Sequence, residues 1–317
     1  MTATFLITGG AGFIGSHLAD RLLADGARVR VLDNFSSGST QNLAEAARAG
    51  DRLKIVEGDI RDLPTVERAV RGVTVIFHQA AMRSVPRSVE DPLGTNDHNV
   101  TGTLNVLEAA RRAGVPRVVY ASSSSVYGDR PDLPKREAQP PSPVSPYAVS
   151  KAAGEQYARV WTKIYGVETV GLRYFNVFGP RQDPRSEYAI VIPRFIYWAL
   201  AGIALEIHGD GEQSRDFTYI DNVVAANVLA ARAPGVAGEV FNVACGDRIS
   251  LLAIVERLEQ MLGKRLERRH TPPRPGDVRH TLADVSHSKQ LLGYEPLVRF
   301  DEGFRRTVEY FRALATA

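Results

Sequence analysis

Cysteine, long apolar runs and blocks of like charge are all scarce in this sequence. Cys245 is the one cysteine among 317 residues, which excludes an internal disulfide and a cysteine-based zinc cluster. The seven histidines show no HExxH or comparable spacing, so we expect no metal. No stretch reaches the about 18 apolar residues of a membrane span. The N-terminal MTATFLITGGAG also lacks a basic leader and a cleavage site, and we expect a cytoplasmic protein without membrane contact.

Charges of the two signs nearly balance. The chain has 39 Lys and Arg against 36 Asp and Glu, a formal net charge of +3, and the basic residues are scattered. We therefore expect no nucleic acid partner. With 44% hydrophobic and 24% charged residues, the composition is that of a globular protein that buries a large core in one or two domains.

Short β-rich runs alternate with segments of helical spacing. Strands are predicted at residues 5–7, 29–32, 53–56, 73–77, 118–120 and 169–172. Helices are predicted between them, among others at residues 16–24 and 102–113. This alternation is typical of a parallel, doubly wound sheet covered on both faces. The predicted fold class is α/β, a Rossmann-like sheet with a smaller α/β substrate-binding domain.

The alternation becomes irregular after about residue 173, which suggests two domains. We expect a cofactor-binding domain over residues 1–173 and a mainly substrate-binding domain over residues 174–317. Residues 239–243 look like one more strand, so the chain would return to the first domain near residues 216–245. Residues 129–146 hold six prolines, and an irregular crossing of this length is usually functional.

A glycine-rich turn, TGGAGFIG at residues 8–15, lies between a predicted strand and a predicted helix. It contains both G-x-x-G-x-x-G and G-x-G-x-x-G, as expected where a pyrophosphate rests on a helix N-terminus. Asp33 ends the next strand, where a carboxylate would accept hydrogen bonds from an adenosine ribose. No Arg follows it to hold a 2′-phosphate, so NAD is favoured over NADP. Asp59 and Ile60 are either a border of the adenine or an ordinary loop.

Four consecutive serines, residues 122–125, follow the apolar strand predicted at 118–120. Serine disfavours helix and sheet interiors, so this run is either a polar turn or a hydrogen-bonding edge built for chemistry. Farther on, PYAVSK begins a helix whose i, i+4 spacing puts Tyr147 and Lys151 on one face. A phenol has a pKa of about 10, so its use as a base near neutrality needs a drop of roughly three units. A fixed ammonium and a nicotinamide cation would supply it.

Several motifs together resemble a known family: TGGAGFIG, Asp33, HQAA at 78–81, SSSSVYG, SPYAVSK and RYFNVFGPRQ. They are similar to those of the extended short-chain dehydrogenase/reductases that act on nucleotide sugars, and the likeness runs from residue 4 to about 296. The sequence most resembles the UDP-hexose 4-epimerases, especially those handling UDP-N-acetylglucosamine (UDP-GlcNAc). The resemblance implies NAD as the cofactor and a UDP-sugar as the substrate.

The resemblance also implies catalytic roles. Tyr147 would remove the proton of the sugar 4-hydroxyl, Lys151 would hold the nicotinamide ribose and lower the pKa of Tyr147, and Ser123 would hydrogen-bond the reacting oxygen. Ser124 would be a second hydroxyl at the substrate. Hydride would pass to tightly held NAD⁺, and the 4-keto sugar would turn over and take it back on its other face. Related 4,6-dehydratases carry an Asp-Glu pair at Ser124 and Ser125, so this chain favours epimerisation over elimination.

The implied binding residues fall into two groups. The NAD-binding group is Gly9, Gly12, Phe13, Ile14, Gly15, Asp33, Asn34, Ser36, Ser37, Gly38, Asp59, Ile60, Gln79, Ala80, Ala81, Asn99, Ser122, Tyr147, Lys151 and Tyr174. The substrate-binding group is Ser84, Ser123, Ser124, Tyr147, Asn176, Gln182, Val191, Arg215, Arg274, Asp277 and Thr281. Within it, Asn176 would contact the diphosphate, Arg215 and Arg274 would pair with phosphate oxygens, and Asp277 would take a uridine ribose hydroxyl.

Sugar choice rests on fewer residues. In the family, the position matched by Thr281 borders the sugar 2-substituent, and a small residue there admits an N-acetyl group. We therefore expect interconversion of UDP-GlcNAc and UDP-GalNAc, together with UDP-Glc and UDP-Gal. Arg83 would pair with a sugar carboxylate in a UDP-glucuronate 4-epimerase, or it is a solvated or phosphate-directed residue.

Two other activities stay open. A net NAD-dependent nucleotide-sugar dehydrogenase would release NADH. A non-catalytic nucleotide-sugar sensor would have no use for Tyr147, Lys151 and Ser123 together. The resemblance further implies a homodimer, which would form through a four-helix bundle of the helices near residues 97–113 and 147–165.

Overall fold

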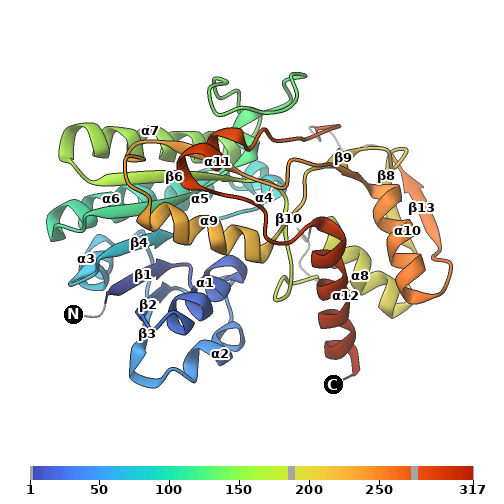
Figure 1. Cartoon of the computed structure of the whole chain (residues 1–317), viewed down its shortest axis with the longest axis horizontal. Coiled ribbons are helices and arrows are strands. Elements are labelled where there is room, and N and C mark those ends of the chain that lie inside the picture. Colours follow the sequence, from blue (N-terminus) through green and yellow to red (C-terminus); the bar gives the residue numbers. More distant parts are fainter. Residues whose placement is uncertain (1–2, 185–189, 273–277, 317) are drawn as a thin grey trace.

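A parallel sheet forms the centre of the molecule in the computed structural model, which describes residues 3–184, 190–272 and 278–316 (Figure 1). Its seven strands lie in the order β11 (Val240–Val243), β6 (Glu168–Tyr174), β5 (Arg117–Ser123), β4 (Val75–His78), β1 (Thr4–Thr8), β2 (Arg28–Asp33) and β3 (Leu53–Glu57). Every neighbouring pair is parallel. The strand order reverses between β1 and β4, and ligands bind at such a switch point in open α/β sheets.

Helices cover both faces of this sheet, because the side chains of each strand alternate between the faces. Leu6 in β1 packs into a cluster with residues of α3 (Leu63–Val70) and α6 (Gly102–Ala113). Its neighbour Ile7 packs into a second cluster with residues of α1 (Phe13–Ala24) and α9 (Ile220–Arg232). The predicted Rossmann-like α/β fold is therefore confirmed.

The remaining elements connect the sheet or build a second, smaller lobe. Those on the sheet side are η1 (Thr40–Leu43), α2 (Ala44–Ala47), η2 (Gly50–Arg52), α4 (Val85–Glu90), α5 (Pro92–Asn96), the π-helical turn η3 (Asp97–Thr101), η4 (Ser124–Tyr127), α7 (Pro146–Tyr165) and α11 (Ser286–Leu292). The lobe at the right of Figure 1 contains α8 (Val191–Ala201), β8 (Leu205–His208), α10 (Leu251–Leu262), β13 (Arg268–Thr271) and α12 (Phe300–Thr316). Within the described residues, no helix combines the length and apolar character needed to cross a membrane.

The remaining strands form three short pairs: β7 (Val177–Phe178) with β10 (Thr218–Tyr219), β9 (Ser214–Arg215) with β12 (Ile249–Ser250), and, within the smaller lobe, β8 with β13. Strand β11 then returns to the main sheet beside β6. The predicted division at residue 173, with a return to the first domain near residues 216–245, stays a prediction.

The proline-rich crossing after η4 is tied to the end of β11. Asn242 in β11 donates through Nδ2 to the carbonyl oxygens of Lys135 (2.9 Å) and Asp284 (3.0 Å). Lys135 also forms an isolated β-bridge with Ala283. These bonds fix the segment that carries Thr281 to the rim of the central sheet.

Candidate active site

A cavity of about 1790 Å³ opens at the carboxyl ends of the central strands. Its wall combines the loops after β1, β2, β4, β5 and β6, the start of α7, and residues of the smaller lobe, among them Arg215 and Thr281. Sites for a single small molecule usually measure roughly 300–1,000 Å³. This cavity therefore has room for a dinucleotide and a second ligand together.

The glycine turn is packed too closely for a side chain at Gly9 or at Gly15. A Cβ atom on Gly9 would lie 2.7 Å from the backbone nitrogen of Ala80, and one on Gly15 would lie 2.3 Å from the Gly9 carbonyl oxygen. Gly12 precedes α1 as its N-cap residue and offers no side-chain cap, and the first turn of α1 contains no acidic residue. The turn and helix thus present backbone N–H groups and the positive end of a helix dipole, which suit a pyrophosphate.

Asp33 joins this turn to the end of β2. Its Oδ2 accepts a hydrogen bond from the Ala11 backbone N–H, and its Oδ1 accepts one from the Phe35 N–H, both at 2.8 Å. A carboxylate oxygen has more than one acceptor site, so both oxygens can still accept a ribose hydroxyl. With the glycine cradle, this geometry fits NAD.

Two residues predicted to bind NAD lie away from the cavity wall. The Asp59 carboxylate accepts hydrogen bonds from Arg61 and from Asn34, and the hydrogen bond from Arg61 is the main reason that its pKa is held well below the usual value. Its neighbour Ile60 does line the cavity. Asn99, in η3, instead bonds the backbone of Met82 through both Nδ2 and Oδ1 and donates to Ser150 Oγ. It fixes the loop after β4 against α7.

The four serines divide between two structures. Ser122 and Ser123 complete β5, and Ser124 and Ser125 begin η4. Ser123 Oγ accepts hydrogen bonds from the backbone N–H of Ser125 (3.2 Å) and from its hydroxyl (2.9 Å). All four line the cavity. The run is therefore a strand end followed by a tight turn, which presents hydroxyls to the cavity without any carboxylate.

Tyr147 and Lys151 lie in the first turns of α7. This helix begins at Pro146, and the Ser145 hydroxyl caps it by accepting from the Ala148 N–H at 3.2 Å. Lys151 Nζ donates to the Ala121 carbonyl oxygen at 2.7 Å and lies 6.0 Å from the centre of the Tyr147 ring. At an effective dielectric constant of about 20, a unit charge at that distance is worth on the order of 3 kcal/mol to a phenolate.

The pKa values of these two groups are shifted by burial. Burial lowers the pKa of Lys151 to about 7, although the charge of Glu155 acts against this. Burial also raises the pKa of Tyr147, while a hydrogen bond with Ser123 and the charge of Arg83 act in the opposite direction. For the protein alone, this direction is opposite to the lowering expected from the sequence, because desolvation outweighs the neighbouring charges.

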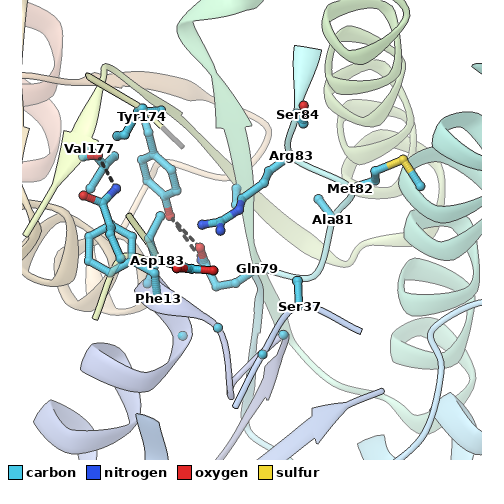
Figure 2. A pocket seen from close by; sticks show the side chains of 18 of the residues that line it. Phe13, Ser37, Gln79, Ala81, Met82, Arg83, Ser84, Tyr174, Val177 and Asp183 are labelled. Atoms are coloured by element: carbon cyan, nitrogen blue, oxygen red, sulfur yellow. Dashed lines mark hydrogen bonds between the residues drawn. The ribbon is translucent and has the colours of Figure 1, made fainter. Parts of the chain in front are cut away.

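The end of the cavity drawn in Figure 2 brings together polar side chains from three strand ends. Tyr174 exchanges hydrogen bonds with Gln79 and with Asn227, and burial raises its pKa to about 12. Arg83 extends from the loop after β4 into the cavity, toward Tyr174 and Asp183 (Figure 2). Gln79 and Tyr174 therefore form a neutral wall, with two charged side chains beside it.

Most described residues predicted to bind substrate also reach the cavity. Ser84, Ser123, Ser124, Tyr147, Asn176, Gln182, Arg215 and Thr281 line it, but Val191 does not. Thr281 Oγ1 accepts hydrogen bonds from Asn176 Nδ2 (3.3 Å) and from the Asp216 N–H (3.2 Å), which places the two predicted residues in contact. The Gln182 side-chain amide accepts a hydrogen bond from the Gly179 N–H and donates one to the Val177 carbonyl oxygen, within the turn that follows β7. The predicted Arg274 and Asp277 lie outside the described residues.

Some cavity residues were not predicted. Arg181 and Asp183 follow the GP pair of the FNVFGPRQ stretch, and Tyr310 and Leu314 in α12 line the outer part. Arg181 has a left-handed φ of 68° and pairs with Asp20 in α1 at 2.6 Å. Arg181 lies within the RYFNVFGPRQ motif, but no periodicity or motif marks the other three residues, since folding alone brings them to the cavity. Across the described ranges, no three His, Cys, Asp or Glu side chains are grouped to hold a metal.

Comparison with known proteins gives the family. Residues 5–244 match the model of the NAD dependent epimerase/dehydratase family. A UDP-glucose 4-epimerase of Mycolicibacterium smegmatis is 43% identical over 309 residues, which cover 97% of this chain and 98% of that one.

Two solved structures share the fold. One is a UDP-N-acetylglucosamine 4-epimerase from Methanobrevibacter ruminantium in complex with UDP-N-acetylmuramic acid, with a TM-score of 0.94, 39% identity and coverage of 99% and 100%. The other is a Thermus thermophilus UDP-glucose 4-epimerase in complex with NAD, with a TM-score of 0.89, 39% identity and coverage of 98% and 99%. The expected resemblance and the NAD cofactor are confirmed, and this chain belongs to the NAD-dependent epimerase/dehydratase family.

Proposed function

We propose that this protein is a 4-epimerase that interconverts UDP-GlcNAc with UDP-GalNAc and UDP-Glc with UDP-Gal. The observation that carries this proposal is the meeting of Tyr147, Ser123 and Lys151 in one cavity with a dinucleotide cradle. Ser124 and Ser125 occupy the same rim, and neither supplies the acid and base that elimination of water would need. Oxidation and reduction at C4 is the chemistry that this set of groups supports.

The residues of the chain have separate tasks in this reaction. Tyr147 takes the proton of the sugar 4-hydroxyl, and Ser123, which acts to lower the pKa of Tyr147, holds the reacting oxygen. Lys151 places a positive charge beside the phenol. Bound NAD⁺, held by the glycine turn and Asp33, would supply a reversible hydride acceptor for C4. Hydride return to the opposite face of the 4-keto sugar would give inversion, and Tyr147 would give its proton back to the oxygen.

The sugar 2-substituent would lie against Thr281. This residue is small, lines the cavity, and is held by Asn176 and Asp216. A short side chain at this place leaves space for an acetamido group. This supports N-acetylated UDP-hexoses as substrates together with the plain ones.

The deciding experiment incubates the purified protein, without added NAD, with UDP-GlcNAc, UDP-Glc and UDP-GlcA in separate reactions. Identification of the sugars by chromatography should show conversion of the first two into their 4-epimers. Reduced nicotinamide should not accumulate with substrate, since each turnover regenerates the cofactor. Accumulation of NADH would indicate a net dehydrogenase, and bound NAD without conversion would indicate a sensor.

A UDP-glucuronate 4-epimerase is the second candidate, and Arg83 favours it. Its guanidinium extends into the cavity and its charge acts on Tyr147. The carboxylate of a uronic acid is attached to C5, next to the reacting C4, and Arg pairs well with carboxylates. Conversion of UDP-GlcA in preference to the other two sugars would establish this alternative.

We further propose a cytoplasmic homodimer. Helix α7 carries exposed apolar side chains along one side, including Val149, Tyr157, Val160 and Ile164. Such a row favours contact with another apolar surface. The matching helix of a second copy is the partner that the resemblance implies.

A further inference from the structure

Three buried ionisable side chains lie together at the candidate active site, and one of them, Lys151, lines the cavity. Lys151 and Glu155 are in α7 and Arg173 is in β6, and their exposed fractions are 4%, 1% and 1%. Arg173 donates to the two Glu155 oxygens from Nε (2.8 Å) and Nη2 (2.7 Å), a bidentate pair. With all three groups ionised, the cluster has one more positive than negative charge. Buried charge of this kind is costly unless a partner compensates it.

The geometry of β5 connects Lys151 to this pair. Lys151 Nζ donates to the carbonyl oxygen of Ala121, and the hydroxyl of the next residue, Ser122, donates to Glu155 Oε1 at 2.5 Å. Lys151 and Glu155 are also one helical turn apart in α7, on the same face. Adjacent residues of one strand therefore hold the ammonium and the carboxylate, so that the carboxylate paired with Arg173 also acts through its charge on Lys151.

Other ionisable groups face the Lys151 ammonium and do not replace Glu155. His78 in β4 is kept neutral, since burial lowers its pKa to about 3. Tyr120 in β5 has its ring centre 5.2 Å from Lys151 Nζ, and burial raises the pKa of this phenol and of Tyr147. Arg83 acts on Tyr147 from across the cavity. Among the described residues that face Lys151, Glu155 is thus the source of negative charge near neutrality.

We propose that the Glu155–Arg173 pair sets the pH range in which Tyr147 and Lys151 work. Glu155 keeps the positive charge on Lys151, and Arg173 limits this effect by sharing the carboxylate. The net positive charge of the cluster is then compensated when Tyr147 gives up its proton. Glu155 and Arg173 touch neither substrate nor reacting atoms in this scheme, so they are positioning residues. This inference rests on the proposed epimerase activity where kcat is measured, but not where the pKa of Lys151 is measured.

The sign of the effect differs between the two partners. Loss of a negative charge lowers every neighbouring pKa, and loss of a positive charge raises it. Glu155→Gln should therefore move both limbs of the kcat against pH profile to lower pH. Arg173→Gln should move both limbs to higher pH. A purely structural role would lower stability in both variants and would not separate the profiles in opposite directions.

The test measures kcat for UDP-Glc and UDP-GlcNAc against pH with the NAD-loaded enzyme. We expect displacements of about one pH unit, each equivalent to a tenfold change in an ionisation constant. Arg117→Gln and Glu168→Gln are the matched controls, because this Arg–Glu pair also involves β6 but lies at the opposite end of that strand, where it joins β6 to β5. Both control profiles should coincide with that of the unaltered enzyme.

A second measurement makes the test independent of turnover. The ¹³Cε resonance of Lys151, assigned by comparison with Lys151→Arg, reports the pKa of this ammonium directly. That pKa should fall in Glu155→Gln and rise in Arg173→Gln. Shifts of equal sign, or none, would overturn the inference, whereas an unaltered protein with no activity on any UDP-sugar would overturn only the proposed function.

Glu155→Gln leaves Arg173 buried without its partner, so this variant risks not folding and further variants are needed. The double variant Glu155→Gln/Arg173→Gln removes both charges and should show a profile between those of the single variants. Glu155→Asp keeps the charge but withdraws it by one methylene, so its shift should be downward and smaller. If Glu155→Gln does not fold, these two variants and Arg173→Gln decide the question, and an upward shift in Glu155→Asp would contradict it.

Discussion

At the scale of single residues, the chemistry depends on how a buried phenol becomes a base. Burial raises the pKa of Tyr147, and neither Ser123 nor Arg83 reverses this direction in the protein alone. Lys151 is itself close to losing its proton near neutrality, because burial lowers its pKa to about 7. We infer that the positive charge of bound NAD⁺ supplies the remaining stabilisation of the phenolate. The base would then be strongest when the hydride acceptor is in place.

Tyr147→Phe tests this assignment most directly. Removal of the hydroxyl should lower kcat for UDP-Glc epimerisation by about 10²- to 10⁴-fold, the usual contribution of general acid–base catalysis. The ring remains, so NAD content and thermal unfolding should change little. Tyr157→Phe is the control, because this tyrosine lies on the same helix and is 36% exposed. Turnover equal to that of the unaltered enzyme would contradict the role of Tyr147.

Thr281→Tyr tests the proposed limit on the sugar 2-substituent. The larger side chain should fill the space of an acetamido group, so kcat/KM should fall for UDP-GlcNAc far more than for UDP-Glc. Thr281→Ser is the control, since it keeps the hydroxyl that bonds Asn176 and Asp216. Undiminished use of UDP-GlcNAc by the tyrosine variant would show that Thr281 does not border the 2-substituent.

At the scale of elements, a strand or helix could be predicted from the sequence when its pattern of apolar residues was long enough to recognise. The strands of the main sheet were predictable, because each is rich in apolar residues, in a run or in alternation as in RVRVLD of β2, and the glycine turn marks the first strand–helix junction. The predicted strand at 118–120 extends to Ser123, since pairing with β6 continues through the serines. Two-residue strands such as Ser214–Arg215 leave no period in the sequence, and only their distant partners define them. The π-helical turn that holds Asn99 likewise has no sequence signal.

Gly15→Ala tests how closely α1 must approach the turn before it. The new Cβ atom would lie 2.3 Å from the Gly9 carbonyl oxygen and 2.7 Å from the Gly10 Cα, so the first turn of α1 would have to shift. We expect weaker retention of NAD through gel filtration and a loss of about 1–3 kcal/mol in the free energy of unfolding. Gly114→Ala is the control, because this glycine ends α6 with a positive φ but has open space around it. It should destabilise the fold while retaining NAD, and equal NAD contents in the two variants would contradict the cradle.

At the scale of the whole molecule, the site is assembled from segments that are far apart in sequence. Thr281 comes to the cavity because β11 and the proline-rich crossing anchor its segment through Asn242. The sequence indicated that residues 129–146 are functional but did not indicate how, since an irregular loop has no repeat that predicts its partners. The residues of α12 that line the outer cavity were unpredictable for the same reason.

Helix α7 carries catalytic residues at its start and exposed apolar residues farther along. It therefore allows the effect of dimer loss on activity to be predicted. Its first turns carry Tyr147 and Lys151, whereas Val160 and Ile164 are 41% and 66% exposed farther along. If the proposed homodimer forms through α7, the unaltered protein should give the mass of two chains by sedimentation. Val160→Glu/Ile164→Glu should give the mass of one, because buried carboxylates would oppose an apolar helix contact. Ile203→Glu, at an exposed isoleucine after α8, should remain dimeric. Tyr147, Lys151 and Ser123 lie together in one chain, so the monomeric variant should keep most of its activity. A dimer that persists in the double variant would place the contact on another surface.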